Sequence, residues 1–338
     1  MRELSADISM SVANESPFAV QPVPLIDRDG NDVLVAIIKG TFIVDRSGRP
    51  TLADDPAPVR IADEPWDPAS PRSSLRFPSD LGVAKLGTDV VVTGDAIAPA
   101  KVPVLDVVVK VRRRLTPLRV HGPRVFSRGV FGVRIGPAQP FLRTPIVYER
   151  AYGGMSEDLS VIELRNPAGV GAAKSAAELV DQPAPQIEHP DRPHGSPSDR
   201  HPPMGFGAIM THWSPRLEYA GTFDARWKAT RMPLPPDDLD VRFGNVAHPS
   251  LQFEEHLAPG DPVGVHGMSL DPLVFALPAL PLAASARYDT GERVVARPPI
   301  DTVLLQPEAR RVELVARAVF PIGRGRRVLR EVVVRGDG

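Results

Sequence analysis

The sequence contains no cysteine. Disulfide bridges, thiolate metal ligands and a cysteine nucleophile are therefore excluded. Long hydrophobic runs are also missing: the longest uncharged apolar stretch, 272–286, holds three prolines and is shorter than the roughly 20 residues of a membrane helix. The N-terminal segment carries Glu3 and Asp7 and lacks the continuous apolar core of a signal peptide. We therefore expect a cytoplasmic protein that does not interact with membranes.

Charge of one sign is not in excess, because the formal net charge is −1 at pH 7. No overall field therefore attracts nucleic acid, and no aromatic residues interleave the bases of 110–119 to form a stacking surface. The phosphate-binding motifs Gly-x-x-x-x-Gly-Lys-Ser/Thr and, after a strand, Gly-x-Gly-x-x-Gly are missing, as is the Gly-x-Ser-x-Gly elbow of hydrolases. The sequence predicts no nucleic-acid partner and no cofactor, and it carries no recognisable catalytic motif.

Proline, by contrast, is abundant, with 39 in 338 residues. Because proline does not fit inside helices or central strands, we expect short segments separated by loops. Apolar and polar residues alternate in 105–111 and 311–318, which is the period of a half-buried strand. Helical patterns are limited to 172–180 and 251–257. The sequence predicts a mainly β fold with few short helices and long Pro-rich loops.

The best candidate for a boundary is the segment 181–203, which holds seven prolines and almost no apolar side chains. It predicts a loop between two packed β-sandwich-like lobes, residues 1–180 and 204–338. One continuous domain over about 14–320 is the alternative.

The same loop is rich in histidine between residues 188 and 201. His189, His194 and His201 lie near carboxylates, and these are suitable ligand types for zinc. A metal site also needs a rigid frame, which a proline-rich polar loop does not supply. We expect this loop to be solvated, mobile and free of metal.

Positive charge is concentrated between Lys110 and Arg150, a range that contains ten bases and one acid, Glu149. If these side chains share a face, they can receive an acidic partner. The run Arg112, Arg113 and Arg114 is the candidate contact. Solvated strand faces and turns are the alternative interpretation.

Two of the three tryptophans, Trp213 and Trp227, lie in one aromatic cluster. Tryptophan is a common anchor at protein interfaces, so both are partner-binding candidates. The more frequent role of such residues is in a β core.

Several charged and polar residues stand beside Gly-Gly and Asn-Pro turns. Buried groups of this kind are tolerated only when paired, so we expect a polar network that joins the two halves. Its predicted members are Glu149, Arg150, Arg165, Asn166 and Asp224. The alternative is catalytic: Glu149 and Asp224 would be the carboxyl pair of a carbohydrate-active hydrolase, about 5–9.5 Å apart.

A series of unusual strings occurs in the order found in one protein family. They include Ser73-Ser-Leu-Arg-Phe-Pro-Ser-Asp-Leu81, Tyr148-Glu-Arg-Ala-Tyr-Gly-Gly154, Arg165-Asn-Pro167, Trp213-Ser-Pro-Arg216 and Ala220-Gly-Thr-Phe-Asp224. On these strings the chain, from about residue 14 to 320, resembles the domain-of-unknown-function family twenty-one sixty-nine, found among type VI secretion accessory proteins.

The resemblance implies an adaptor or chaperone that stabilises a toxic effector in the producing cell and helps load it onto the secretion spike. Its expected partners are a cognate secreted effector and, in addition, a spike or spike-tip protein. The resemblance supplies no catalytic residues. A sugar-binding or structural β module is a further alternative to the hydrolase.

Overall fold

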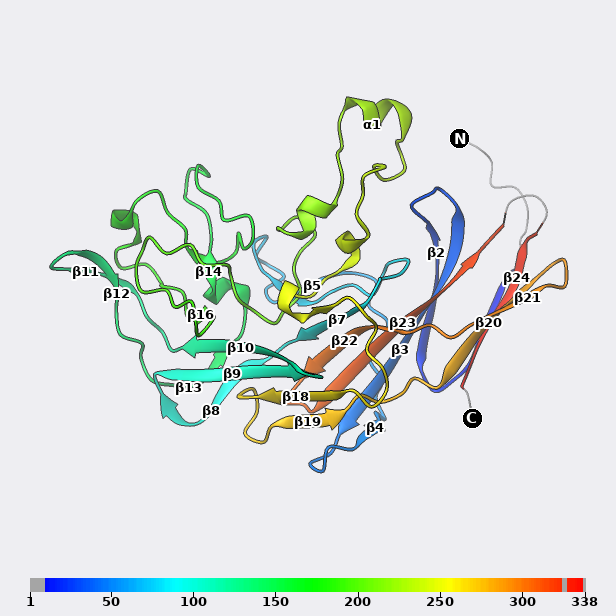
Figure 1. Cartoon of the computed structure of the whole chain (residues 1–338), viewed down its shortest axis with the longest axis horizontal. Coiled ribbons are helices and arrows are strands. Elements are labelled where there is room, and N and C mark those ends of the chain that lie inside the picture. Colours follow the sequence, from blue (N-terminus) through cyan, green and yellow to red (C-terminus); the bar gives the residue numbers. More distant parts are fainter. Residues whose placement is uncertain (1–9, 324–326, 337–338) are drawn as a thin grey trace.

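The structure is a computed structural model that describes residues 10–323 and 327–336 (Figure 1). Strands account for 43% of the described residues and helices for 7%. The described part has one α-helix, α1 (Ala225–Thr230). The prediction of a mainly β fold is therefore confirmed. No helix in the described ranges is long and apolar enough to cross a membrane.

The largest sheet forms the centre of the molecule. Its order is β17 (Gln252–Phe253), β7 (Thr88–Val92), β22 (Ile300–Gln306), β23 (Arg311–Pro321), β3 (Asp32–Val44) and β2 (Ala19–Ile26), with β4 (Pro50–Leu52) paired to β3. Only β22 and β7 run parallel; the other pairs in this sheet are antiparallel.

Two further sheets and several strand pairs surround this centre. One sheet has the order β16 (Ile187–Glu188), β10 (Arg114–His121), β9 (Val104–Val111), β18 (Pro262–His266) and β19 (Leu273–Ala276). The other has the order β1 (Ser11–Glu15), β24 (Leu329–Gly336), β20 (Leu282–Tyr288) and β21 (Arg293–Ala296). The pairs are β5 (Glu64–Pro65) with β6 (Leu75–Phe77), β8 (Asp95–Val102) with β13 (Phe141–Pro145), β11 (Phe126–Gly129) with β12 (Gly132–Ile135), and β14 (Tyr152–Gly153) with β15 (Val170–Gly171).

Short 3-10 helices lie in the connections. They are η1 (Tyr148–Arg150), η2 (Ala176–Leu179), η3 (Arg216–Tyr219), η4 (Val241–Gly244) and η5 (Pro249–Leu251). Figure 1 shows β11, β12 and β14 in a loop-rich region at one end, the sheet of β20, β21 and β24 at the other end, and α1 on an arm that projects from the middle.

Strands from both sides of the segment 181–203 share the same sheets. The central sheet joins β2, β3 and β7 to β22 and β23, and the second sheet joins β9 and β10 to β18 and β19. The segment itself contributes β16, which pairs with β10. Residues 1–180 and 204–338 therefore do not each have a sheet of their own.

Strand β3 is buried on both faces of the central sheet. Its even-numbered residues from 34 to 38 join the main hydrophobic core, and its odd-numbered residues from 33 to 37 join a second cluster with Val315. Because side chains alternate along a strand, Lys39 faces the second cluster, where it is fully buried. An ammonium group inside a protein requires partners of opposite charge.

Two carboxylates supply those partners. The Nζ of Lys39 lies 2.8 Å from Asp80 and 2.9 Å from Glu313, and both carboxylates are buried. Glu313 also accepts two hydrogen bonds from the guanidinium of Arg60, at 2.5 and 3.1 Å. Since Arg60 and Asp80 belong to the segment that covers this face, the ion pairs attach the covering segment to the sheet.

We expect Lys39→Met to lower the free energy of unfolding by about 3–5 kcal/mol, because it leaves the buried carboxylate of Asp80 without its paired cation and leaves Glu313 with Arg60 but without Lys39. The measurement is urea unfolding at neutral pH. Lys101→Met, at an exposed lysine on β8, is the matched control and should change stability by less than about 0.5 kcal/mol. Equal stability of the two variants would contradict this account of the sheet.

Candidate functional site

The three arginines at 112–114 lie at the turn between β9 and β10, and two of them are held by the protein itself. Arg112, at a φ of 53°, donates from Nε to Asp261 at 2.8 Å. Arg114 donates to the carbonyl of Gln252 at 2.5 Å. The Arg113 side chain is exposed and forms no ion pair or hydrogen bond within the described residues, so it alone is free to meet a partner.

Three other bases between 110 and 150 form ion pairs with acids. These pairs are Arg119 with Asp106, Arg124 with Glu188, and Arg143 with both Asp95 and Glu308. Four of the ten bases are therefore neutralised by an acid, counting Arg112 with Asp261, and the other six form no ion pair within the described residues. The ten bases do not form one unpaired basic face.

The polar residues around η1 hold three segments together. Glu149 accepts hydrogen bonds from the backbone N–H of Ser74 at 2.6 Å and from its hydroxyl at 2.7 Å. Arg150 donates to the side chain of Gln186 at 2.7 Å. Asn166, which is fully buried, donates from Nδ2 to two backbone carbonyls of the η1–β14 segment. These parts of the predicted network are separate local contacts, and none of them joins residues 1–180 to residues 204–338.

The other two predicted members lie outside it. Arg165 pairs with Glu163, two residues away, at 2.6 Å. Asp224 is exposed and caps the N-terminus of α1 by accepting from the backbone N–H of Trp227 at 2.8 Å. Aspartate is one of the preferred residues at the N-cap position of a helix, and capping is a structural role. Glu149 and Asp224 thus have separate structural partners. These contacts do not support the pair of catalytic carboxylates that a hydrolase needs.

The two tryptophans have different environments. Trp213 is 2% exposed and packs edge-on against Tyr148, with 5.6 Å between ring centroids. Trp227 is half-buried on α1, and its ring meets that of Phe223 at 4.8 Å. Trp227 is therefore the member of the pair that a partner can reach.

The loop 181–203 differs from the solvated segment that its composition predicts. Ile187 and Glu188 form β16 and are buried, and His194 is 5% exposed. The Glu188 carboxylate accepts from the guanidinium of Arg124 at 2.9 Å and from the backbone N–H of His194 at 2.8 Å, and it lies 2.6 Å from Nε2 of His121. Because the Glu188 carboxylate has these partners, this acidic, proline-rich segment can pack in the interior of the protein.

The same contacts determine how Glu188 titrates. Burial on its own would raise the pKa of this carboxyl, but hydrogen bonds from His121 and His194 and the positive charge of Arg124 outweigh burial and hold the pKa well below its usual range. The group therefore stays ionised in the folded protein. No group of three or more histidine and carboxylate side chains suited to a metal ion occurs among the described residues.

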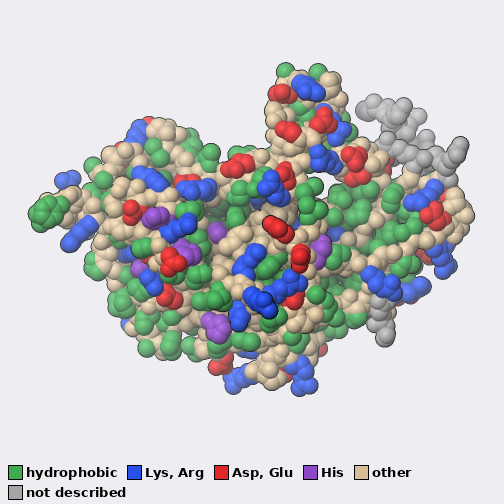
Figure 2. Space-filling view, viewed as in Figure 1, with side chains coloured by type: hydrophobic (Ala, Val, Ile, Leu, Met, Phe, Trp, Pro, Cys, Tyr) green, Lys and Arg blue, Asp and Glu red, His purple; other side chains and the backbone are tan. Residues whose placement is uncertain are grey.

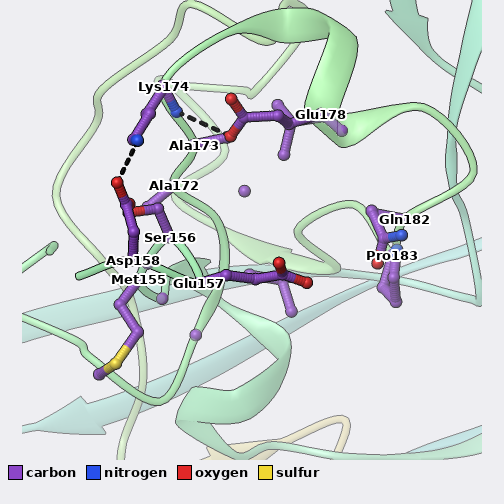
Figure 3. A pocket seen from close by; sticks show the side chains of 16 residues that line it. Met155, Ser156, Glu157, Asp158, Ala172, Ala173, Lys174, Glu178, Gln182 and Pro183 are labelled. Atoms are coloured by element: carbon purple, nitrogen blue, oxygen red, sulfur yellow. Dashed lines mark hydrogen bonds and ion pairs between the residues drawn. The ribbon is translucent and has the colours of Figure 1, made fainter. Parts of the chain in front are cut away.

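A cavity of about 540 Å3 opens beside this loop (Figure 3). Its apolar lining includes Val170 and Leu179, and Glu157, Asp158, Lys174 and Glu178 lie around it. Lys174 forms an ion pair with Asp158, which leaves the charges of Glu157 and Glu178 unneutralised by lysine.

The most exposed apolar side chains of the described chain were not predicted from the sequence. Val130 and Phe131, at the turn between β11 and β12, are 93% and 103% exposed. Figure 2 shows this apolar tip at the left end of the molecule, with basic side chains beside it. The available signal was the string Gly129-Val-Phe-Gly132, in which large apolar residues occupy turn positions that usually hold polar ones.

We expect Glu188→Gln to cost about 3 kcal/mol of folding stability at pH 7, because it leaves the buried guanidinium of Arg124 without its carboxylate. Since the pKa of Glu188 is lower in the folded protein than its ordinary value of 4.5, its stabilising effect is present above that value and is lost as the pH falls. The difference from wild type should therefore shrink toward about pH 3. Urea unfolding across this pH range, with the exposed Glu157→Gln as control, measures it; a difference that does not change with pH would contradict the assignment.

The family model of the uncharacterized proteins conserved in bacteria, DUF2169, matches residues 29–317. No curated protein and no solved structure matches the chain. The matched range begins before β3 and ends within β23, so it includes strands from both sides of the segment 181–203. The chain therefore belongs to the DUF2169 family of uncharacterized bacterial proteins.

Proposed function

We propose that this protein is a type VI secretion adaptor that binds a cognate effector in the producing cell, stabilises it and helps load it onto the secretion spike. Two observations support the proposal. The first is membership of the DUF2169 family, whose resemblance to type VI secretion accessory proteins implies such a role. The second, which supports the binding role, is the projecting arm that bears α1 and exposes large apolar side chains.

The arm runs from η3 to η4 and projects from the sheets (Figure 1). Phe223 is 60% exposed and Met232 is 59% exposed, on either side of α1. Aromatic residues and methionine are enriched at protein interfaces, where they fill pockets of the partner. Phe223 together with Trp227 therefore provides an anchor of the usual type.

Contacts at its base and along its length hold the arm in place. Nε1 of Trp227 donates to the carbonyl of Leu234 at 2.9 Å, and Arg28 in the β2–β3 turn donates to the carbonyl of Asp237 at 2.5 Å. A surface that is already ordered loses less conformational entropy when a partner binds. The arm is thus suited to binding without first having to fold.

Charges of both signs surround the apolar residues of the arm. The acids are Glu218, Asp224, Asp237, Asp238 and Asp240, and the bases are Arg226, Lys228, Arg231 and Arg242. A mixed rim of this kind matches a protein surface, whereas nucleic acid selects an excess of bases. The structural roles of Glu149 and Asp224 also favour binding over hydrolysis.

Deletion of the gene should reduce the level or the secretion of one effector and leave other secreted cargo unchanged. The reason is that an adaptor covers the exposed surface of its own cargo and stabilises it by binding. Co-expression with the effector encoded beside the gene, followed by co-purification, tests the binding directly. The proposal fails if no neighbouring effector co-purifies and its level does not change in the deletion strain.

Replacement of the two exposed apolar residues of the arm, Phe223 and Met232, should weaken capture without unfolding the protein. Phe223→Glu combined with Met232→Glu puts charge where the partner's pocket excludes water, and we expect at least a tenfold weaker affinity, equivalent to about 1.4 kcal/mol. Leu270→Glu, at a similarly exposed leucine before β19, is the matched control. Equal capture by both variants would show that the arm is not the contact.

Arg113 should affect the rate of capture rather than the fold. Arg113→Glu should slow association at low salt, and the deficit should diminish as salt rises, because exposed charges are screened over about 8 Å at physiological ionic strength. Stopped-flow or surface-based association kinetics measure this, with the exposed Arg72→Glu as control. Rates that match the control at every salt concentration would exclude a role for the β9–β10 turn.

A further inference from the structure

The β11–β12 hairpin is a rigid projection with an apolar tip. At its base Phe126 is 2% exposed and packs with Leu179 and Ala184. Backbone hydrogen bonds of 2.8 and 2.9 Å join Phe126 to residues 181 and 182. Val130 and Phe131 at the other end contact water over nearly their whole surface. A fixed hairpin that exposes large apolar residues is typical of an interaction site.

The hairpin carries only positive charge. Residues 125–140 contain Arg128 and Arg134 and no acid, so their net charge is +2. Both arginine side chains are exposed, and neither forms an ion pair within the described part of the chain. Because the two residues are on opposite faces of the strand pair, they lie on either side of the apolar tip.

The cavity beside β14 and β15 has the complementary character. Three carboxylates and one ammonium line it, Glu157, Asp158, Glu178 and Lys174, so the net charge is −2. Its volume of about 540 Å3 falls within the roughly 300–1,000 Å3 of pockets that enclose small ligands. It can therefore hold one phenylalanine and one valine side chain, with carboxylates left at the rim for arginine.

We propose that two copies of this chain associate by exchanging these hairpins, so that Val130 and Phe131 of each copy enter the cavity of the other. Arg128 and Arg134 then face the carboxylates of Glu157 and Glu178. Hairpin and cavity are neighbours in one chain, since Leu179 packs against the hairpin base and also lines the cavity. One surface patch thus contains both halves of the contact, which is the condition for a closed two-fold dimer.

The tip fits a protein pocket better than a lipid surface. Burial of one valine and one phenylalanine is worth about 1.5–3 kcal/mol each. Even a myristoyl chain gives only marginal and reversible membrane binding, so these two side chains would not hold the protein on a bilayer. In a two-fold dimer the contact occurs twice, and the resulting area is still at the low end of specific interfaces.

The test is the molar mass of the purified full chain, measured by light scattering from about 1 to 100 µM, the range in which so small an interface dissociates. We expect a reversible rise from 36.5 kDa toward twice that mass, at a concentration that increases with salt. Phe131→Ser should keep the protein monomeric, whereas Leu270→Ser should dimerise like the wild type. Circular dichroism verifies that each variant is folded.

A charge exchange tests which surfaces meet. The hairpin variant Arg128→Glu/Arg134→Glu and the cavity variant Glu157→Arg/Glu178→Arg should each be monomeric, because like charges then face each other. Their equimolar mixture should form a dimer, since both contacts become complementary again. A mixture that stays monomeric overturns the pairing of hairpin and cavity.

Two further outcomes also overturn the proposal. One is a wild type that remains at 36.5 kDa at every concentration, and the other is a dimer that survives in both charge-reversed variants. If the wild type is monomeric and the Phe131→Ser variant no longer captures the effector, the tip binds the effector instead. A monomer that binds vesicles of phosphatidylglycerol and phosphatidylcholine through Phe131 would assign it to lipid.

Discussion

The ammonium of Lys39, buried between the carboxylates of Asp80 and Glu313, constrains the centre of the molecule. One face of the central sheet is apolar and forms the main core, while the opposite face combines a smaller apolar cluster with the buried ion pairs of Lys39. Two charges taken out of water cost several kcal/mol each unless they are paired. The covering segment places Asp80 beside Lys39, and Glu313 on the neighbouring strand β23 supplies the second carboxylate, so both elements contribute to the neutralisation of the buried ammonium.

Neighbouring pairs extend this arrangement across the sheet. Arg317 of β23 forms an ion pair with Asp301 of β22, and Lys85 forms one with Asp89 of β7 at 2.6 Å. Each cation has its anion on an adjacent strand or on the segment before it. A hydrophobic pair of similar volume is often as stable as a buried ion pair, so the value of such contacts lies in their geometric specificity. Here the pair of Arg317 and Asp301 joins β23 to β22, whereas the pair of Lys85 and Asp89 is local to β7.

The loop-rich region depends on close backbone approach as well as on charge. Gly153, at a φ of 151°, lies so close to Asn166 that a Cβ would be 2.2 Å from its carbonyl oxygen. Gly154 similarly leaves room for the carbonyl of Gly169. These contacts hold β14 beside β15, and Glu188 holds the loop 181–203 against β10. Loops anchored in this way can bound a cavity and support a rigid hairpin.

The sequence by itself determined the fold class, because the density of proline and the two-residue period of apolar side chains leave little room for helices. It did not predict β2, since Pro22 and Pro24 argue against a strand. The structure tolerates them because β2 lies at the edge of the sheet, where missing N–H donors break no ladder. The order of strands was likewise decided only by pairing between distant segments, such as β3 with β23.

The candidate sites were also predicted in part from the sequence, and the rest became visible only in the tertiary structure. The sequence identified Trp227 and Arg113 as candidate contacts, and it also named Trp213, which the fold buries. It treated Glu188 as part of a solvated loop, because nothing local reveals that Arg124 and His121 receive its carboxylate. Side-chain type and period are local properties, and a sequence contains them directly. Burial, ion pairing and the exposure of a tip are settled by residues far apart in the chain, and only the tertiary structure brings these together.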